Sequence, residues 1–170
     1  MIVGLMSWAP NKFGILWFCQ KVYPLLRSKI PNLKLSLVGP NPEEDILSLD
    51  GKNGITVYGE VESLDSYYKR ASVLVAPIFS GSGVRIKILH ALSFGVPVLS
   101  TKIGAEGMKT DNRSGVIISD SSPIIFAENI LKILNSKKES NRLSRDGIKY
   151  INKHYSDSES ERIINWGLLS

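Results

Sequence analysis

The segment 73–108 constrains the fold of this chain more than any other part of its sequence. Residues 73–76 form a short apolar run, which predicts a buried strand, and Pro77 ends it. Small residues fill positions 80–83, and a helix is expected over residues 84–94. A strand, a glycine-rich turn and a helix in this order favour an α/β fold with the turn at the carboxyl end of a parallel strand.

The glycine-rich turn has the composition of an anion site. Gly81 and Gly83 let a ligand approach the backbone, and the N–H groups at the start of the following helix attract negative charge. Arg85 and Lys87 add two cations near the same helix start. The turn therefore predicts a phosphate or diphosphate site. A turn that binds nothing and a solvated Arg85 are the alternative interpretations.

Strands and helices alternate over the rest of the chain, which predicts a parallel sheet with helices on both faces. The 170 residues are enough for one domain with its own core. We therefore expect a three-layer α/β/α fold with about six strands and with ligand loops at their carboxyl ends. Strands are expected at residues 2–6, 33–38, 54–58, 73–76, 96–100 and 115–118, and helices at 13–27, 41–50, 63–70 and 84–94, from 123 onward, and as two segments within 139–166.

Composition excludes several classes of protein. Apolar residues make up 43% of the chain, but no apolar run approaches the ~20 residues that cross a bilayer, and no signal-peptide pattern opens the sequence. The single cysteine, Cys19, excludes an internal disulfide and suits a reducing, cytoplasmic compartment. Because it falls within an expected helix, we interpret Cys19 as a core residue rather than a reactive thiol.

The net charge of +5 allows nucleic acid, an anionic membrane or a phosphorylated ligand as partner. No run of Lys or Arg exceeds two residues, and basic residues do not alternate with aromatic ones. The pattern therefore predicts no binding of nucleic acid, whereas peripheral contact with anionic lipid stays open. Metal binding is not expected, because His90 and His154 are far apart in sequence and no His/Cys/Asp spacing matches a metal site.

Motifs spaced over most of the chain occur in an order that resembles a known family. They are Val3-Gly4 with Trp8-Ala9-Pro10-Asn11, Leu37-Val38-Gly39, Val57-Tyr58-Gly59, Pro77, Gly81-Ser82-Gly83, Arg85, Lys87-Ile88-Leu89-His90-Ala91, Gly95-Val96-Pro97-Val98 and Gly104-Ala105-Glu106-Gly107. This pattern resembles the C-terminal, donor-binding domain of retaining GT-B glycosyltransferases, in glycosyltransferase family 4 or glycosyl transferases group 1. The resemblance implies a Rossmann-like fold, the C-terminal half of GT-B.

The resemblance implies that Arg85 and Lys87 are the catalytic residues. During sugar transfer, negative charge builds up on the leaving diphosphate. The two cations would stabilise it together with the backbone amides of Gly83 and Val84. No general base is expected in this half of the enzyme.

Two glutamates that the family usually carries are replaced here by Ser82 and His90. The second commonly binds the ribose hydroxyls, and a neutral His can donate and accept hydrogen bonds, so ribose contact is expected for His90, with packing as the alternative. The first often touches the donor sugar, where Ser82 is the shorter substitute. The Arg and Lys that many members carry after the first strand correspond here to Leu5 and Asn11.

The resemblance also implies which other loops bind the donor. They lie after the first, third and fifth strands, and a plain turn is the alternative for the last of them. The residues are Gly4, then Gly59, Glu60 and Val61 in a base-recognition loop, then Ala105, Glu106 and Gly107 beside the donor sugar.

The implied reaction is transfer of a sugar from a UDP- or GDP-sugar to a hydroxyl acceptor, with retention at the anomeric carbon and without a metal or other cofactor. A separate N-terminal acceptor domain, absent from residues 1–170, would complete the enzyme, so the isolated domain is expected to be inactive. Polysaccharide or glycolipid synthesis would place the enzyme in the cytoplasm, at the inner face of the membrane.

Two alternatives to the transferase stay open. Replacement of both glutamates is compatible with a catalytically degenerate domain that binds nucleotide sugars or serves assembly. A fragment of a GT-B sugar-nucleotide epimerase would share the fold and the ligand. A dinucleotide-dependent oxidoreductase is not expected, because Gly4 stands alone where the Gly-x-Gly-x-x-Gly fingerprint would follow the first strand.

Overall fold

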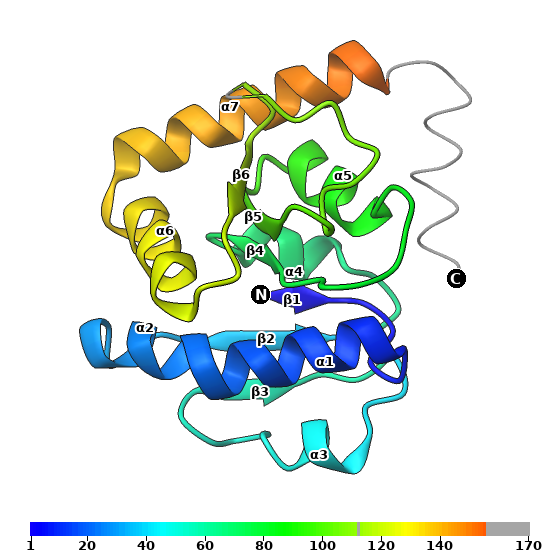
Figure 1. Ribbon diagram of the computed structural model, residues 1–170, viewed down its shortest axis with the longest axis vertical. Helices are drawn as coiled ribbons and strands as arrows, with labels where there is room; N and C mark the ends of the chain where they lie inside the picture. The colour runs from blue at the N-terminus through cyan, green and yellow to red at the C-terminus, as the bar shows by residue number, and fades with distance from the viewer. Residues whose placement is uncertain (112, 156–170) are drawn as a thin grey trace.

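The computed structural model of the chain describes residues 1–111 and 113–155, and in them six parallel strands lie between two layers of helices (Figure 1). This confirms the predicted α/β class. The observed strands are shorter than expected at most ends. They are β1 (Ile2–Val3), β2 (Leu35–Val38), β3 (Ile55–Val57), β4 (Leu74–Ala76), β5 (Val98–Thr101) and β6 (Val116–Ser119).

The strands form two three-stranded ladders, β1-β2-β3 and β4-β5-β6, rather than the single continuous sheet expected. The ladders meet edge to edge at β1 and β4. There the amide of Val75 donates to the carbonyl of Met1 at 2.9 Å, and the amino group of Met1 donates to Val73 O at 2.9 Å. The spatial order is therefore 3-2-1-4-5-6. It reverses between β1 and β4, where ligands bind in sheets of this kind.

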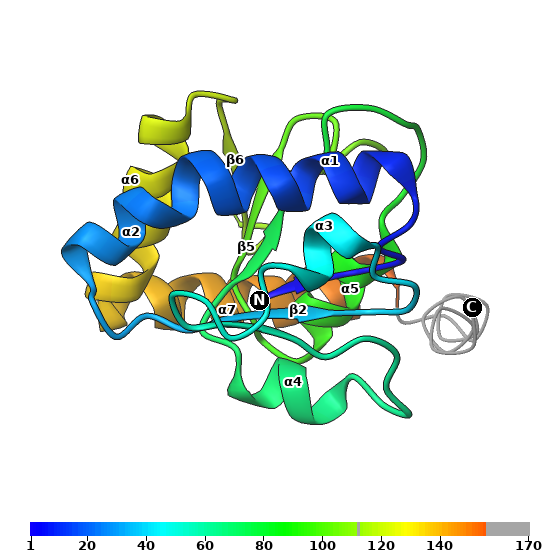
Figure 2. The same cartoon turned by 90° about the horizontal axis from the view of Figure 1, so that it is seen from below.

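A long helix crosses one face of the sheet and contains a π-helical turn (Figure 2). It consists of α1 (Ala9–Trp17), the π turn η1 (Phe18–Val22) and α2 (Tyr23–Lys29), so it begins four residues before the expected start. Pro24 has no N–H to donate to the preceding turn, and the π turn just before it absorbs this break in the hydrogen-bond ladder. The pattern analysis missed this interruption.

Gly14 lets α1 lie directly on the end of β4. A Cβ atom at Gly14 would stand 2.0 Å from the carbonyl oxygen of Pro77, a distance that no side chain permits. The start of α1 is therefore fixed against the loop that follows β4, on the other side of the reversal in strand order.

The remaining helices are α3 (Glu44–Leu47), α4 (Asp65–Arg70), α5 (Ile86–Ser93), α6 (Pro123–Asn135) and α7 (Lys137–His154). Helix α5 begins two residues later than expected, because Arg85 still has extended backbone angles. Helix α7, which runs without a break to His154, accounts for one of the two helical segments expected within 139–166. The part of that prediction beyond residue 155 lies outside the described residues.

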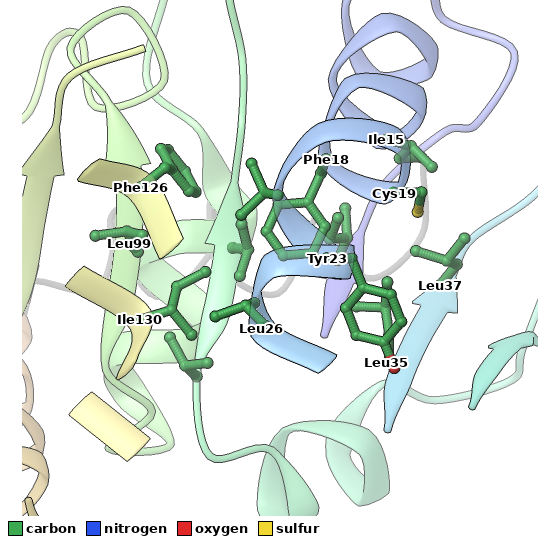
Figure 3. Close-up of a cluster of buried hydrophobic side chains, with 14 of the residues drawn as sticks. Ile15, Phe18, Cys19, Tyr23, Leu26, Leu35, Leu37, Leu99, Phe126 and Ile130 are labelled. Carbon is green, nitrogen blue, oxygen red and sulfur yellow. The ribbon is translucent and has the colours of Figure 1, made fainter. Parts of the chain in front are cut away.

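Two apolar cores hold the helix layers on the sheet. The first, shown in Figure 3, packs the long helix and α6 against the strands through side chains such as Phe18, Leu26 and Phe126. The second packs α4, α5 and α7 on the other face, through Tyr68 and Ile88 among others. Within the described residues, no helix is both long and apolar enough to cross a membrane.

Cys19 lies in the π turn and faces the first core (Figure 3). Its side chain is buried, and desolvation raises the pKa of the thiol to about 12. This confirms the interpretation of Cys19 as a core residue, because a thiol with such a pKa is not ionised at neutral pH.

Candidate functional site

A cleft of about 640 Å³ opens at the carboxyl ends of the strands, where the strand order reverses. The loops after β1, β2 and β3 form one side of it, and the start of α5 forms the other. The topology therefore brings together loops that are far apart in sequence, as expected for the ligand site of a parallel sheet.

Most of the residues predicted for the site line this cleft. They are Gly4, Glu60, Val61, Val84, Arg85, Lys87 and His90. Gly59 lies just behind it, where its carbonyl accepts the amide of Gly39 at 2.8 Å. Ser82 and Gly83 belong to the exposed loop ahead of α5 and are not part of the lining.

Arg85 is held in place but keeps buried donors without partners. Its Nη1 donates to the carbonyl oxygen of Ser82 at 2.6 Å, and its guanidinium carbon lies 5.5 Å from the centroid of the Trp8 ring. Its Nε and Nη2 are buried and bind no acceptor among the described residues. Buried donors are normally satisfied, so these two indicate a missing acceptor. At least these two donors of Arg85 are therefore shielded from solvent.

Lys87 points its amine into the same cleft. Its Nζ donates to Val3 O at 2.8 Å and to Asn11 Oδ1 at 2.7 Å. Burial, with a smaller contribution from the neighbouring Arg85 guanidinium, lowers the pKa of Lys87 from 10.5 to about 7. Both hydrogen-bond acceptors of Lys87 are neutral oxygens. No described carboxylate forms a salt bridge with Lys87 or Arg85. An anion in the cleft would favour the charged form of Lys87.

His90 shares its side of α5 with Lys87, as the helical spacing predicts, and both line the cleft. The His90 side chain is 4% exposed and meets the Tyr68 ring edge-on at 6.0 Å between centroids. The Tyr68 hydroxyl donates to the carbonyl of Lys87 at 3.3 Å, so Tyr68 packs inside the fold and also fixes the first turn of α5.

Val84 was expected to be the first residue of the helix over residues 84–94, but it lies outside α5 and its buried stripe. Its side chain is 41% exposed, whereas Ile88, Ala91 and Leu92 are fully buried. The reason is the late start of the helix, which leaves Val84 in the loop at the mouth of the cleft.

The turn of residues 104–107 lies next to the cleft rather than in its lining. A Cβ atom at Gly107 would stand 2.9 Å from Cγ2 of Val84, which places the turn against the loop ahead of α5. The amides of Ala105 and Glu106 donate to Thr101 O and Ile103 O, both at 3.2 Å. These amides are thus already bonded within the turn, and a ligand could use them only if those bonds opened. The Glu106 side chain is exposed.

Sequence reasoning missed how two residues after β1 support the cations. Trp8, named above only as part of the first motif, stacks with Arg85, and Asn11 binds Lys87. No sequence signal could have revealed these contacts, because the two members of each pair are more than 70 positions apart.

A second cavity, of about 550 Å³, lies at the opposite end of the strands, around Met1, Leu35 and Val73 at the starts of β1, β2 and β4. Of its two cations, Lys34 is exposed, and Arg70 already stacks on Tyr67 at 5.3 Å and donates to Ser66 O. This cavity therefore offers no donor set comparable to that of Arg85. Among the described residues, no cluster of three or more His, Cys, Asp or Glu could hold a metal ion.

The family model described as "Glycosyl transferases group 1" matches residues 1–136. The chain belongs to this family. A curated relative in Klebsiella pneumoniae, described as an uncharacterised 44.6 kDa protein in the cps region, is 26% identical over 165 residues. The match covers 91% of this chain and 42% of that relative, so the chain spans less than half of the relative's length.

Several solved structures resemble this group 1 domain. They include a mutant of S. aureus TarM in complex with Fondaparinux, alpha-GlcNAc-glycerol and UDP, with a TM-score of 0.75 at 17% identity over 98% of this chain and 35% of that one. Anabaena HepE in complex with UDP and glucose has a TM-score of 0.71 at 14% identity, over 99% and 48% of the two chains. WaaG, a glycosyltransferase involved in lipopolysaccharide biosynthesis, has a TM-score of 0.72 at 17% identity, over 97% and 46%. These likenesses establish the GT-B type of fold.

Proposed function

We propose that this group 1 domain binds a nucleoside diphosphate sugar in the cleft, with the diphosphate against Arg85 and Lys87. The observation that carries the proposal is the pair of buried Arg85 donors without acceptors, beside a half-buried amine held by neutral oxygens. A diphosphate supplies several anionic acceptors at once, which is what this set of donors lacks.

In the complete enzyme the reaction would be glycosyl transfer to a hydroxyl acceptor. The bond between the anomeric carbon and the diphosphate oxygen breaks, a bond to the acceptor oxygen forms, and the bonding electrons leave with the diphosphate. Arg85 and Lys87 stabilise that developing charge, assisted by the amides of Gly83 and Val84. The acceptor's proton goes to the leaving phosphate or to a base from outside this domain. We also propose that the configuration at the anomeric carbon is retained and that the reaction needs no metal ion, as the resemblance to the family implies.

The rest of the donor would extend from this point along the cleft. The loop of Gly59, Glu60 and Val61 is proposed to bind the base, and His90 the ribose hydroxyls, because both lie on the walls of the cleft. Glu106 would then approach the sugar from the neighbouring turn. The UDP named in the TarM and HepE structures supports a uridine nucleotide, and GDP remains the alternative.

The acceptor site is proposed to lie in a further domain, because the chain spans 42% of its Klebsiella relative. The description of that relative as a protein of the cps region, and the role of WaaG in lipopolysaccharide biosynthesis, support synthesis of a polysaccharide or glycolipid. With such a substrate, we propose that the enzyme is located in the cytoplasm, at the inner face of the membrane.

Calorimetric titration of the chain with UDP, GDP and ADP tests the proposal. We expect one nucleotide to bind with a Kd between about 1 μM and 1 mM. The variant Arg85→Ala plus Lys87→Ala should weaken that binding at least about 100-fold, because each charge-assisted hydrogen bond contributes about 1.5–3 kcal/mol. Lys29→Ala plus Lys138→Ala removes two exposed cations outside the cleft and is the matched control. A folded chain that binds none of the nucleotides, or binds equally after loss of both cations, would overturn the proposal.

Replacement of the family's two glutamates by Ser82 and His90 favours one second candidate, a domain that binds the donor but transfers no sugar. The two functions differ in turnover and not in nucleotide binding. Donor consumption by the full-length protein, followed as UDP release in the presence of acceptor lipid or oligosaccharide extracts, separates them.

A further inference from the structure

Asn11 is a buried polar residue in the first turns of α1, and both ends of its side-chain amide are used. Its Nδ2 donates to Leu5 O at 2.9 Å, and its Oδ1 accepts from Lys87 Nζ at 2.7 Å. The residue is 6% exposed, whereas asparagine is mostly found at the surface. The amide thus joins the loop after β1 to the first turn of α5, two segments 76 positions apart in the chain.

The amine of Lys87 is oriented by these contacts but is not neutralised by them. An ammonium group has three N–H donors, and two are directed to Val3 O and Asn11 Oδ1. No hydrogen bond takes the third within the described part of the chain, and Lys87 lines the cleft. One donor is therefore left for a ligand, and its direction is set by the other two.

The backbone around Gly4 leaves room for this arrangement and for little else. A Cβ atom at Gly4 would stand 2.7 Å from Asn11 Nδ2 and 3.0 Å from Lys87 Nζ. The backbone φ angle of Gly4 is +141°, a value that residues other than glycine rarely adopt. The glycine therefore brings the amide and the amine together at the end of β1.

We infer that Asn11 is a positioning residue: its neutral amide holds the Lys87 amine at the end of β1, aimed into the cleft, where it binds the diphosphate of the donor. The inference rests on the proposed function of the cleft, since it assigns a role in that same site. The neutral character of the amide is essential. An aspartate here would pair with Lys87 and repel the diphosphate, and a lysine would repel the amine.

The test compares two variants at position 11 with the wild type by UDP calorimetry between pH 7 and pH 9. Asn11→Ala removes both hydrogen bonds and should weaken UDP binding about tenfold. Asn11→Asp keeps the shape of the side chain but adds a charge, and it should weaken UDP binding at least as much. The new carboxylate also raises the pKa of Lys87, so the loss of UDP affinity expected for the wild type above pH 7 should disappear in Asn11→Asp.

Two controls separate positioning from plain structural support. In a Lys87→Ala background, Asn11→Ala should change UDP affinity less than twofold, because the group that it positions is gone. Asn129→Ala removes a comparable side-chain amide, which donates to Ser119 Oγ at 3.1 Å outside the cleft, and should leave UDP binding unchanged. If Asn11→Ala unfolds at the assay temperature, Asn11→Asp and Asn11→Ser decide the question.

The outcomes separate the inference from the proposed function. If the wild type binds no nucleotide, the proposed function fails and the inference fails with it. If the wild type binds UDP, and Asn11→Ala and Asn11→Asp match its affinity and its pH profile, only the role of Asn11 is overturned. An equal effect of Asn11→Ala with and without Lys87 also overturns it, because the contribution would then be structural.

Discussion

Two strand–loop–helix units face each other across the reversal of the sheet, and they differ in charge. The unit of β1 and α1 contributes neutral groups, the ring of Trp8 and the amide of Asn11. The unit of β4 and α5 has an exposed loop over residues 80–84 and contributes both cations, Arg85 and Lys87.

This difference shows how a site can present positive charge without cancelling it. Carboxylates beside Arg85 and Lys87 would hold the cations more firmly, but a ligand would have to displace them. A stacked ring and an amide orient the same cations and leave their charge available. The repulsion between the two cations is then relieved when an anion enters the cleft.

The largest expected effect comes from separating the two units at Gly14. Helix propensity alone predicts that Gly14→Ala stabilises the chain by about 1 kcal/mol. The contact with Pro77 reverses the sign, because the new Cβ would meet the carbonyl oxygen at 2.0 Å and force α1 off the end of β4. We expect a loss of about 3 kcal/mol in the free energy of unfolding, measured by urea denaturation. Gln20→Ala, exposed on the same long helix, should stay within about 0.5 kcal/mol, and a stabilised Gly14→Ala would disprove the close contact.

A second, smaller effect should appear in the pH dependence of UDP affinity, through Lys87 in the unit of β4 and α5. With a pKa of about 7, Lys87 is half neutral at pH 7, and a bound diphosphate favours its charged form. UDP affinity should therefore fall between pH 7 and pH 9, by at most about tenfold per pH unit.

The stability of the ligand-free chain should respond to Lys87 in the opposite direction. The pKa of this amine is lower in the folded chain than its usual 10.5, so the unfolded chain binds more protons between the two values. Lys87 therefore opposes folding least at high pH, and its contribution to stability rises from pH 7 toward pH 10.5. Calorimetry and urea denaturation over this range, with Lys87→Met as the comparison, measure both trends. Equal pH profiles for Lys87→Met and the wild type would exclude Lys87 as their source.

The smallest effect is expected in the neutral unit, at Trp8. Removing the ring in Trp8→Ala should weaken UDP binding about threefold, because a partly exposed cation–π contact contributes about 0.5–1 kcal/mol. Trp8→Phe keeps an aromatic face under Arg85 and should retain most of the affinity. If both variants bind UDP as the wild type does, Trp8 does not support Arg85.

Local patterns predicted the parts of the fold that depend on local physics. Alternation of apolar runs and turns predicted the six strands, and helical spacing placed Lys87 and His90 on one side of α5. The contacts of Asn11 with Lys87 and of Trp8 with Arg85 depend on which strand lies beside which. A pattern of apolar residues contains no such information.

Two errors had a local cause that the patterns hid. The π turn before Pro24 was missed because the apolar stripe of the helix continues across it. The regular pattern of α-helical backbone hydrogen bonds does not continue there. Val84 was placed at the start of the helix after the glycine-rich turn, but the extended backbone of Arg85 delays the start of that helix.

The buried thiol in the π turn has a consequence for studies of motion. A reagent for cysteines reacts with the thiolate, and Cys19, with a pKa of about 12, reacts only when the core around it opens to water. Since the sequence contains one cysteine, the rate of labelling reports one event, the detachment of the long helix from the sheet. The same helix carries Asn11 in its first turn, so slower labelling with UDP present would indicate that nucleotide binding at the start of the helix also holds its middle against the sheet.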